Sequence, residues 1–214
     1  MDSNDSPPRR LTRAETKART RTLLLDAAAQ EFARKGFAGA SVDDIAERAG
    51  FSVGALYSNF AKKEDLFLEL LAGRSGHQLA EAAQIVADQD SSVQERRQAL
   101  GRLLVAAADK DVDLAPLQAE FWLYAVRRPE IQEQLSSQFR TTRDTLAESL
   151  AAWARDRGRP GDLPLDALST VVLALFQGLV QLRRTDPALV PESLYGTALG
   201  WLLTGITALT EESS

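Results

Sequence analysis

Apolar residues recur at helical spacing through almost the whole chain, and segments with the alternating pattern of a β-strand are nearly absent. Leu24, Ala28 and Phe32 step by four residues through a first helix that we expect to end at Lys35, before Gly36. Clusters of Pro, Gly, Ser and Asp separate later stretches of the same pattern. The sequence therefore predicts an all-α protein, with further helices at residues 42–49, 53–58, 63–86, 93–108, 117–126, 129–156, 166–184 and 191–209.

The composition excludes several classes of protein. The 214 residues contain no Cys and a single His, His77, so thiolate or poly-His metal sites and thiol nucleophiles are ruled out. The first ten residues lack the apolar stretch of a secretory signal or membrane anchor. Two uncharged runs, 167–182 and 193–210, approach the length of a membrane span but contain several Ser, Thr, Gln or Gly. We expect a cytoplasmic protein that does not enter the membrane.

Charge is distributed unevenly along the chain. Residues 1–63 hold 11 Lys and Arg against 8 Asp and Glu, whereas residues 64–214 hold 14 against 22. The amino-terminal part is therefore basic, with a net charge of +3, and the remainder is acidic, with a net charge of −8. A regional excess of positive charge favours a nucleic-acid partner for the amino-terminal part.

Two short helices joined through a glycine follow the first helix. Ser41 begins a capping signature with Asp44 three residues later, and Gly50 is placed to end that helix. Ser52 can cap the next helix, which is very short. Two short capped helices with a small apolar contact face are typical of a helix-turn-helix, which binds DNA.

The segment Ser41–Leu66, SVDDIAERAGFSVGALYSNFAKKEDL, resembles the DNA-binding domain of the TetR family of transcriptional regulators, as does RTLLLDAAAQEFARKGF before it. The resemblance covers about a quarter of the chain; beyond it only the all-helical pattern fits. It implies a homodimeric regulator with a three-helix DNA-binding domain and a ligand-responsive helical domain. We expect a flexible basic arm at 1–17, the helix-turn-helix domain at 18–63 and an effector-binding and dimerisation domain at 64–214.

The expected contacts with the DNA backbone come from helix starts and nearby polar residues. Ser41 and Ser52 present free backbone N–H groups and a hydroxyl, which suit a phosphate. In the family, residues that match Tyr57, Asn59 and Lys63 commonly touch the backbone, so the resemblance implies this role here, although Asn59 stands where the family often has His. For Tyr57 the alternative is a ring packed against the first helix. Further phosphate contacts are expected from Arg19, Arg21 and Lys62.

Base recognition is expected from small residues, because the second short helix lacks the Arg, Gln or Asn that pair with guanine or adenine. Leu56 is assigned to the core. An Arg-rich lead-in that includes Arg9 and Arg10 fits either a minor-groove arm or a solvated tail. Val53, Gly54 and Ala55 can touch thymine methyl groups, and Ser52, Tyr57 and Ser58 can make single hydrogen bonds to bases.

The last two helices are apolar on more than one face, which predicts a partner for each. The alternative is one large intramolecular core. A homodimer with twofold symmetry is the commonest soluble assembly, and the family pairs these two helices with their copies. The expected interface residues are Leu175, Gly178, Leu179, Leu182, Ala198, Trp201, Leu202 and Gly205, and Gly200 would also permit close approach.

Aromatic residues cluster on the central helices with polar residues between them. Each one fits an ordinary core position, but together they suggest a mainly apolar cavity for a small-molecule effector. Arg140 or Arg143 could serve an anionic ligand. The expected lining residues are Phe121, Trp122, Tyr124, Phe139, Arg143, Trp153, Phe176 and Gln177.

No catalytic constellation is evident. Asp43, Asp44 and Glu47 could suggest a magnesium site, but the dipole of a helix already favours acidic residues in its first turn. Asp109, Asp111, Asp113 and Glu120 have calcium-loop spacing, but Leu114 occupies the position that needs glycine. We therefore expect no metal, no cofactor and no enzymatic activity. The function predicted from sequence is a repressor released from a palindromic operator by an effector; the alternatives are a helical interaction module and an all-α enzyme.

Overall fold

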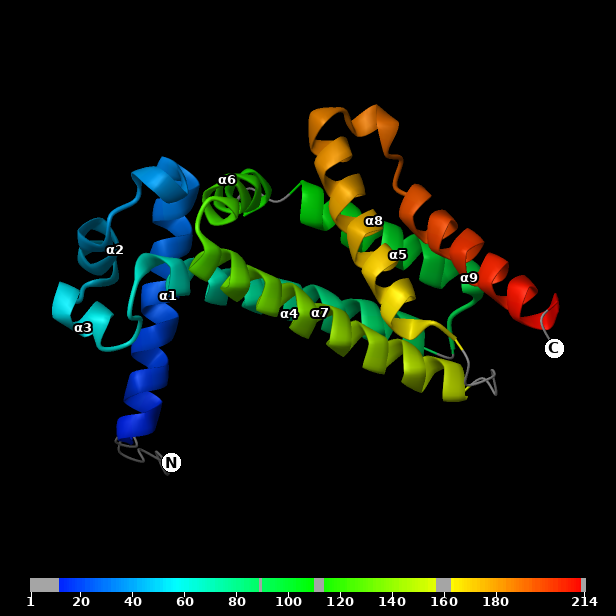
Figure 1. Cartoon of the computed structure of the whole chain (residues 1–214), viewed down its shortest axis with the longest axis horizontal. Helices are drawn as coiled ribbons and strands as arrows, with labels where there is room; N and C mark the ends of the chain where they lie inside the picture. Colours follow the sequence, from blue (N-terminus) through cyan, green and yellow to red (C-terminus); the bar gives the residue numbers. More distant parts are fainter. Residues whose placement is uncertain (1–11, 89, 110–113, 157–162, 213–214) are drawn as a thin grey trace, which may run out of the picture. The chain divides into compact units, whose positions relative to one another are not determined.

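The computed structural model describes residues 12–88, 90–109, 114–156 and 163–212, and all regular elements in these ranges are helices (Figure 1). For this part of the chain the prediction of an all-α fold is confirmed. The helices are α1 (Arg13–Gly39), α2 (Val42–Ala49), α3 (Val53–Tyr57), α4 (Lys63–Ala87), α5 (Val93–Ala108), α6 (Leu114–Val126), α7 (Pro129–Asp156), α8 (Leu165–Thr185), the 3-10 helix η1 (Pro187–Leu189) and α9 (Leu194–Glu212).

The caps of α2 and α3 are those that the sequence predicts. The Ser41 hydroxyl accepts a hydrogen bond from the backbone N–H of Asp44 at 3.1 Å. Gly50 ends α2 in the left-handed conformation, with φ 74° and ψ 27°, which glycine adopts without steric cost. The Ser52 hydroxyl caps α3 by accepting from the backbone N–H of Ala55 at 3.1 Å.

The first helix is longer than expected at both ends. Thr12 and Glu15 form a capping box, so α1 already begins at Arg13, inside the segment assigned to a flexible arm. Gly36 has φ 73° and ψ 170° and interrupts the helical conformation where the sequence predicted an end. The backbone resumes a helical turn after this kink and reaches Gly39.

Two later helices start three residues away from their predicted positions. Helix α6 begins at Leu114 rather than Leu117, and α9 begins at Leu194 rather than Pro191. The Asp186 side chain accepts a hydrogen bond from the backbone N–H of Ala188 at 2.9 Å and caps η1. Residues 191–193 then form a turn, in which the backbone N–H of Leu194 donates to the Pro191 carbonyl oxygen at 3.0 Å, and α9 starts only after it.

The chain divides into two compact units, Met1–Leu70 and Leu71–Ser214, and α4 contributes residues to both. The first unit has an aromatic core in which the rings of Phe32, Phe37 and Phe67 lie 5.4 to 5.6 Å apart. Leu56 of α3 is fully buried, as predicted. The three rings pack α1 against α4, while α2 packs against both α1 and α3 and so positions the helix-turn-helix.

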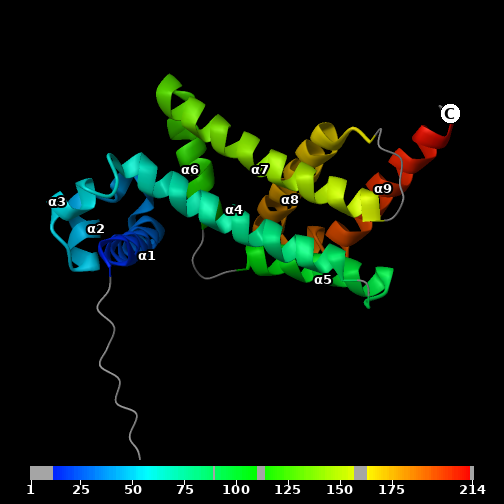
Figure 2. The same cartoon turned by 90° about the horizontal axis from the view of Figure 1, so that it is seen from below.

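In the second unit α8 packs against α7 and α5, while α9 packs mainly along α5 (Figure 2). Helices α5 and α9 approach so closely that a Cβ atom on Gly196 would lie 2.3 Å from the carbonyl oxygen of Arg97. A Cβ on Gly200 would lie 2.6 Å from the Arg97 guanidinium. Gly200 therefore serves a contact within the chain, which differs from the expected role in dimer packing.

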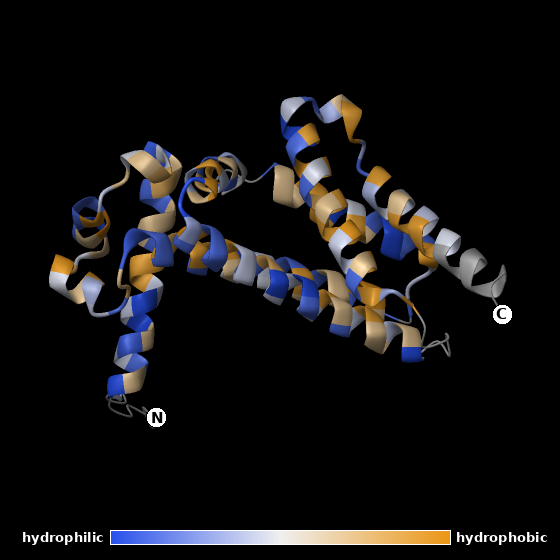
Figure 3. Ribbon diagram, in the orientation of Figure 1, coloured by the Kyte–Doolittle hydropathy of each residue, from blue (hydrophilic) through white to orange (hydrophobic). Residues whose placement is uncertain are grey.

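Helix α8 is the one helix in the described ranges that is long and apolar enough to cross a membrane. Only 22% of its most apolar window is buried in the chain. Figure 3 shows apolar residues along both α8 and α9. A core or interface helix of a soluble protein passes the same test of length and composition, so this finding is weak evidence for a membrane span.

Candidate nucleic-acid interface and effector cavity

The residues predicted to read bases surround α3, and several of them are exposed. Tyr57 has 53% of its surface exposed and is therefore not buried in the core. The α3 backbone also has room at Gly54, where a Cβ would meet nothing closer than the Ser52 hydroxyl at 3.8 Å. The exposed residues are Ser52, Gly54, Tyr57 and Ser58; Val53, Ala55, Asn59 and Lys62 are partly buried.

Two of the predicted phosphate ligands make contacts inside the first unit. The guanidinium of Arg21 forms an ion pair with Glu69 and donates to the Asn59 carbonyl oxygen at 2.5 Å. It also lies 4.1 Å from the centroid of the Phe60 ring. These contacts hold the segment after α3 against α1, so Arg21 has a structural role that the sequence did not indicate.

Lys63 is held in a similar way at the start of α4. Its ammonium donates to the carbonyl oxygens of Phe37 at 2.7 Å and Ala40 at 2.9 Å, and lies 4.6 Å from the Phe37 ring centroid. These hydrogen bonds satisfy carbonyls at the carboxyl end of α1. Arg19 is exposed, and Lys62 is partly buried, with its backbone N–H donating to the Asp65 carboxylate at 3.2 Å.

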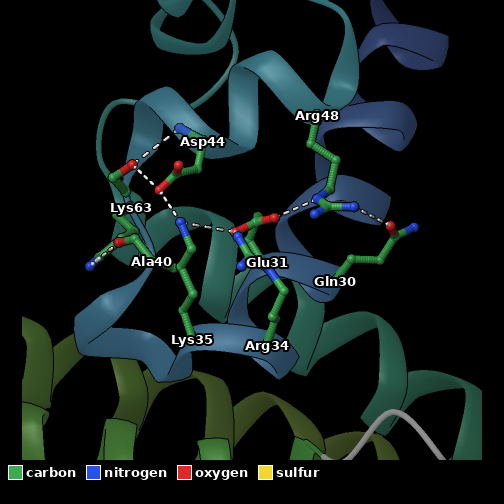
Figure 4. Close-up of polar contacts among 9 residues, drawn as sticks. Gln30, Glu31, Arg34, Lys35, Ala40, Asp44, Arg48 and Lys63 are labelled. Carbon is green, nitrogen blue, oxygen red and sulfur yellow. Dashed lines mark hydrogen bonds and ion pairs between the residues drawn. The ribbon is translucent and has the colours of Figure 1, made fainter.

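A network of ion pairs joins α1 to α2 (Figure 4). Its centre is Glu31, which is 1% exposed and lies 2.8 Å from Arg34, 3.5 Å from Lys35 and 2.5 Å from Arg48. Lys35 also lies 2.7 Å from Asp44 on α2. This network was not predicted from the sequence, although the spacing of Glu31 from Ala27 and Ala28 places it on the buried face of α1.

The network shifts the pKa values of its acids. The hydrogen bond from Lys35, helped by Ser41, lowers the pKa of Asp44 to about 2. The Arg34 guanidinium, followed by that of Arg48, lowers the pKa of Glu31. Both carboxylates are therefore ionised at neutral pH, and their ion pairs hold α2, the first helix of the helix-turn-helix, against α1.

We expect the first unit to lose stability as the pH falls from about 4 to about 2. The folded pKa of Asp44 lies below its unfolded value of about 3.9, so its contribution is complete above that value and is lost on protonation. Thermal unfolding of the parent and Asp44→Asn between pH 6 and pH 2 checks this. The variant should show a smaller fall in Tm over this range, and equal falls in the two proteins would contradict the assignment.

The second unit contains a cavity of about 960 Å³. Phe121 is almost fully buried, whereas Trp122 and Phe139 are 53% and 40% exposed. Two further residues predicted to line the cavity are not among its described lining residues: Tyr124 stacks on Phe121, and Arg143 pairs with Asp144 at 2.6 Å. Of the eight residues expected to line a cavity, those that do so are Phe121, Trp122, Phe139, Trp153, Phe176 and Gln177.

The residues expected at a dimer interface divide into two groups. Leu179 is buried in the core of the second unit and Leu175 packs against that core, so the chain itself covers both. The second group, together with Val171, forms an apolar face of α8 and α9 that the chain itself leaves uncovered. Its members are Gly178, Leu182, Trp201 and Gly205, which are exposed, and Ala198 and Leu202, which are partly buried.

Residues considered for metal or catalytic roles make other contacts. No group of three or more His, Asp or Glu side chains suited to a metal ion occurs among the residues that the structure describes. Asp109 pairs with Arg183 at 3.0 Å, while Asp111 and Asp113 lie outside the described residues. His77 is exposed and lies 4.0 Å from Glu81 of the same helix.

Two capped helices joined at a left-handed glycine, with hydroxyl and small residues exposed on the second, define a helix-turn-helix DNA-binding protein. The family described as "Bacterial regulatory proteins, tetR family" matches residues 24–70. The family described as "BetI-type transcriptional repressor, C-terminal" matches residues 93–200, half of the chain. The chain therefore belongs to the TetR family of bacterial transcriptional regulators.

Individual relatives agree with this assignment. The chain is 46% identical over 57 residues to the transcriptional repressor KstR2 of Rhodococcus jostii, covering 27% of this chain and 28% of that protein. It spans about a quarter of the length of the first curated relatives that it matches. The transcriptional regulator TtgR of Pseudomonas putida is 28% identical over 203 residues, which cover 91% of this chain and 93% of TtgR.

Solved structures show the same fold. A transcriptional regulator from Pseudomonas aeruginosa PAO1 superposes with a TM-score of 0.67 at 23% identity, covering 93% of each chain. Salmonella enterica GusR has a TM-score of 0.62 at 24% identity, covering 92% of this chain and 98% of GusR. The names of the family and relatives indicate a regulator rather than an enzyme.

Proposed function

We propose that this protein is a cytoplasmic homodimeric repressor that binds a palindromic operator and is released by a small-molecule effector. The observation that carries the proposal is the capped pair α2–α3, in which Ser52, Gly54 and Tyr57 are exposed on one short helix. In a helix-turn-helix the second helix enters the major groove. A helical interaction module would explain the second unit but not this capped helix pair, which lies in the basic amino-terminal part of the chain.

Selection of bound sequences from a random DNA pool tests the proposal with the full chain. A dimer with twofold symmetry reads two half-sites, so the selected sequences should converge on a palindrome. Retention of DNA without any consensus would contradict a sequence-specific repressor. Retention of none would refute DNA binding altogether.

Affinity for the selected operator should depend steeply on salt. Arg19 and Lys62 supply two candidate phosphate contacts per subunit; four per dimer give a log–log slope of about −4. If Arg21 and Lys63 exchange their internal contacts for phosphates, eight contacts give about −7. Titrations at several salt concentrations distinguish these values, and a slope near zero would argue against DNA as the partner.

Loss of the Tyr57 hydroxyl should weaken binding without disturbing the fold, because the ring is 53% exposed. A hydrogen bond to a charged group contributes about 1.5–3 kcal/mol, which corresponds to a loss of roughly tenfold or more. Tyr124→Phe, in the second unit, is the matched control. Equal operator affinity in Tyr57→Phe and the parent would remove Tyr57 from the interface.

The cavity of the second unit is proposed as the effector site. A ligand alters operator affinity only if it binds two arrangements of the dimer differently, and a coupling of about 1–3 kcal/mol corresponds to about 5–150-fold. Trp122 and Trp153 line the cavity, whereas Trp201 does not. A ligand found by thermal-shift screening should therefore change the fluorescence of the first two more than that of Trp201; if neither they nor operator affinity respond, the cavity is not the effector site.

A further inference from the structure

The charged residues that line the cavity are unusual for this half of the chain. Residues 64–214 hold 22 Asp and Glu against 14 Lys and Arg. Among the described lining residues, however, there is no Asp or Glu, and the charged side chains are Arg74, Arg96 and Arg97. The cavity is therefore positive as well as largely apolar, although the surrounding unit is acidic.

Arg74 lines this cavity near the last turn of α5. Its Nη2 donates to the carbonyl oxygen of Ala107 at 3.0 Å, and Arg184 donates in the same way to Ala108 at 3.0 Å. Burial, followed by the positive charge of Arg184, lowers the pKa of Arg74. A guanidinium has five N–H donors, so an anion could use those that the carbonyl does not take.

The other two arginines have structural contacts. Arg96 donates to the carbonyl oxygens of Asp88, at 2.8 Å, and Ser91, and so fixes the turn before α5. The guanidinium of Arg97 lies against Gly200 of α9. Arg74 donates to one carbonyl oxygen among the described residues, whereas Arg96 donates to two and Arg97 is packed against α9. Arg74 is therefore the lining cation best placed to meet a ligand, with Ser75 and Gln78 lining the cavity beside it on α4.

We propose that the cavity binds an amphiphile with one anionic head group and an extended apolar body, and that Arg74 pairs with the head. The proposal rests on the effector site proposed above. Two parallel N–H···O bonds from an arginine suit a planar carboxylate, and an ion pair is stronger where water is partly excluded. The apolar body would lie along aromatic rings such as Phe121, Trp153 and Phe176.

Three probes with the same ten-carbon chain test the proposal on the full-length protein: decanoate, decanol and decyltrimethylammonium. Calorimetry should show decanoate binding at least tenfold tighter than decanol, with the cation weakest. Arg74→Gln should weaken decanoate at least tenfold and change decanol less than twofold. Arg140→Gln, which alters an exposed arginine outside the lining, should leave all three affinities unchanged.

Arg74→Lys keeps the positive charge and should retain the preference for decanoate, which provides a second variant if Arg74→Gln does not fold. Equal affinities for decanoate and decanol, unchanged decanoate binding in a folded Arg74→Gln, or no binding of any probe would overturn the proposal. Operator affinity measured in the same samples separates the two ideas. A preference for decanoate with no effect on operator affinity supports the head-group assignment but refutes the effector function. Release of the operator by decanol alone supports the effector function but refutes the head-group assignment.

Discussion

Gly205→Arg is expected to produce a monomer that binds the operator at least about 100-fold more weakly. A Cβ at Gly205 would meet no atom within 4 Å, so the chain itself accommodates a side chain there. Arginine also favours a helix by nearly 1 kcal/mol over glycine, so the isolated subunit should lose no stability. The new charge would instead enter the contact between the uncovered faces of α8 and α9.

The loss of operator affinity follows from the loss of linkage between the two half-sites. In a dimer the second head binds as an intramolecular event, which can strengthen binding by about 10² to 10⁴. Sedimentation and operator titration measure the two effects. Gly76→Arg is the matched control, because its Cβ would also meet open space but it lies on α4. A monomeric parent, or a dimeric variant with full operator affinity, would refute the interface.

Phe67→Ala should destabilise the first unit by about 3–5 kcal/mol, the usual cost of truncating a buried Phe. Phe67 is 2% exposed, and its ring lies 5.5 Å from that of Phe32 and 5.4 Å from that of Phe37. A unit of this size has little stability to spare. Removal of the ring should therefore unfold the helix-turn-helix and abolish operator binding.

Hydrogen exchange measures the stability of each unit separately. Amides of α1, α2 and α3 should lose protection in Phe67→Ala, while those of α5 and α8 should keep it. Phe139→Ala, which removes a ring that is 40% exposed, is the matched control and should leave the first unit protected. Retained protection of α1–α3 in Phe67→Ala would show that the aromatic core is not what holds this unit together.

The local features of the fold could be predicted because they depend on residues close together in the sequence. Ser41 and Ser52 cap helices through backbone groups three residues away, and Gly50 ends α2 because it adopts positive φ. The periodicity of apolar residues was sufficient to identify the α-helices of the described residues, but not the short 3-10 helix η1. The boundaries that differ depend on finer local competition, as where residues 191–193 form a turn instead of the first turn of α9.

The sequence by itself determined the all-α class, the capped helix pair and, through these residues, the family. Tertiary structure alone decided which long charged side chains make contacts within the protein. Arg21 and Lys63 make contacts with residues 48 and 23 to 26 positions away, and Arg74 lines the cavity where Arg143 was expected. Capping and periodicity act within one helical turn, whereas these contacts exist only after distant helices have packed, so no local pattern specifies them.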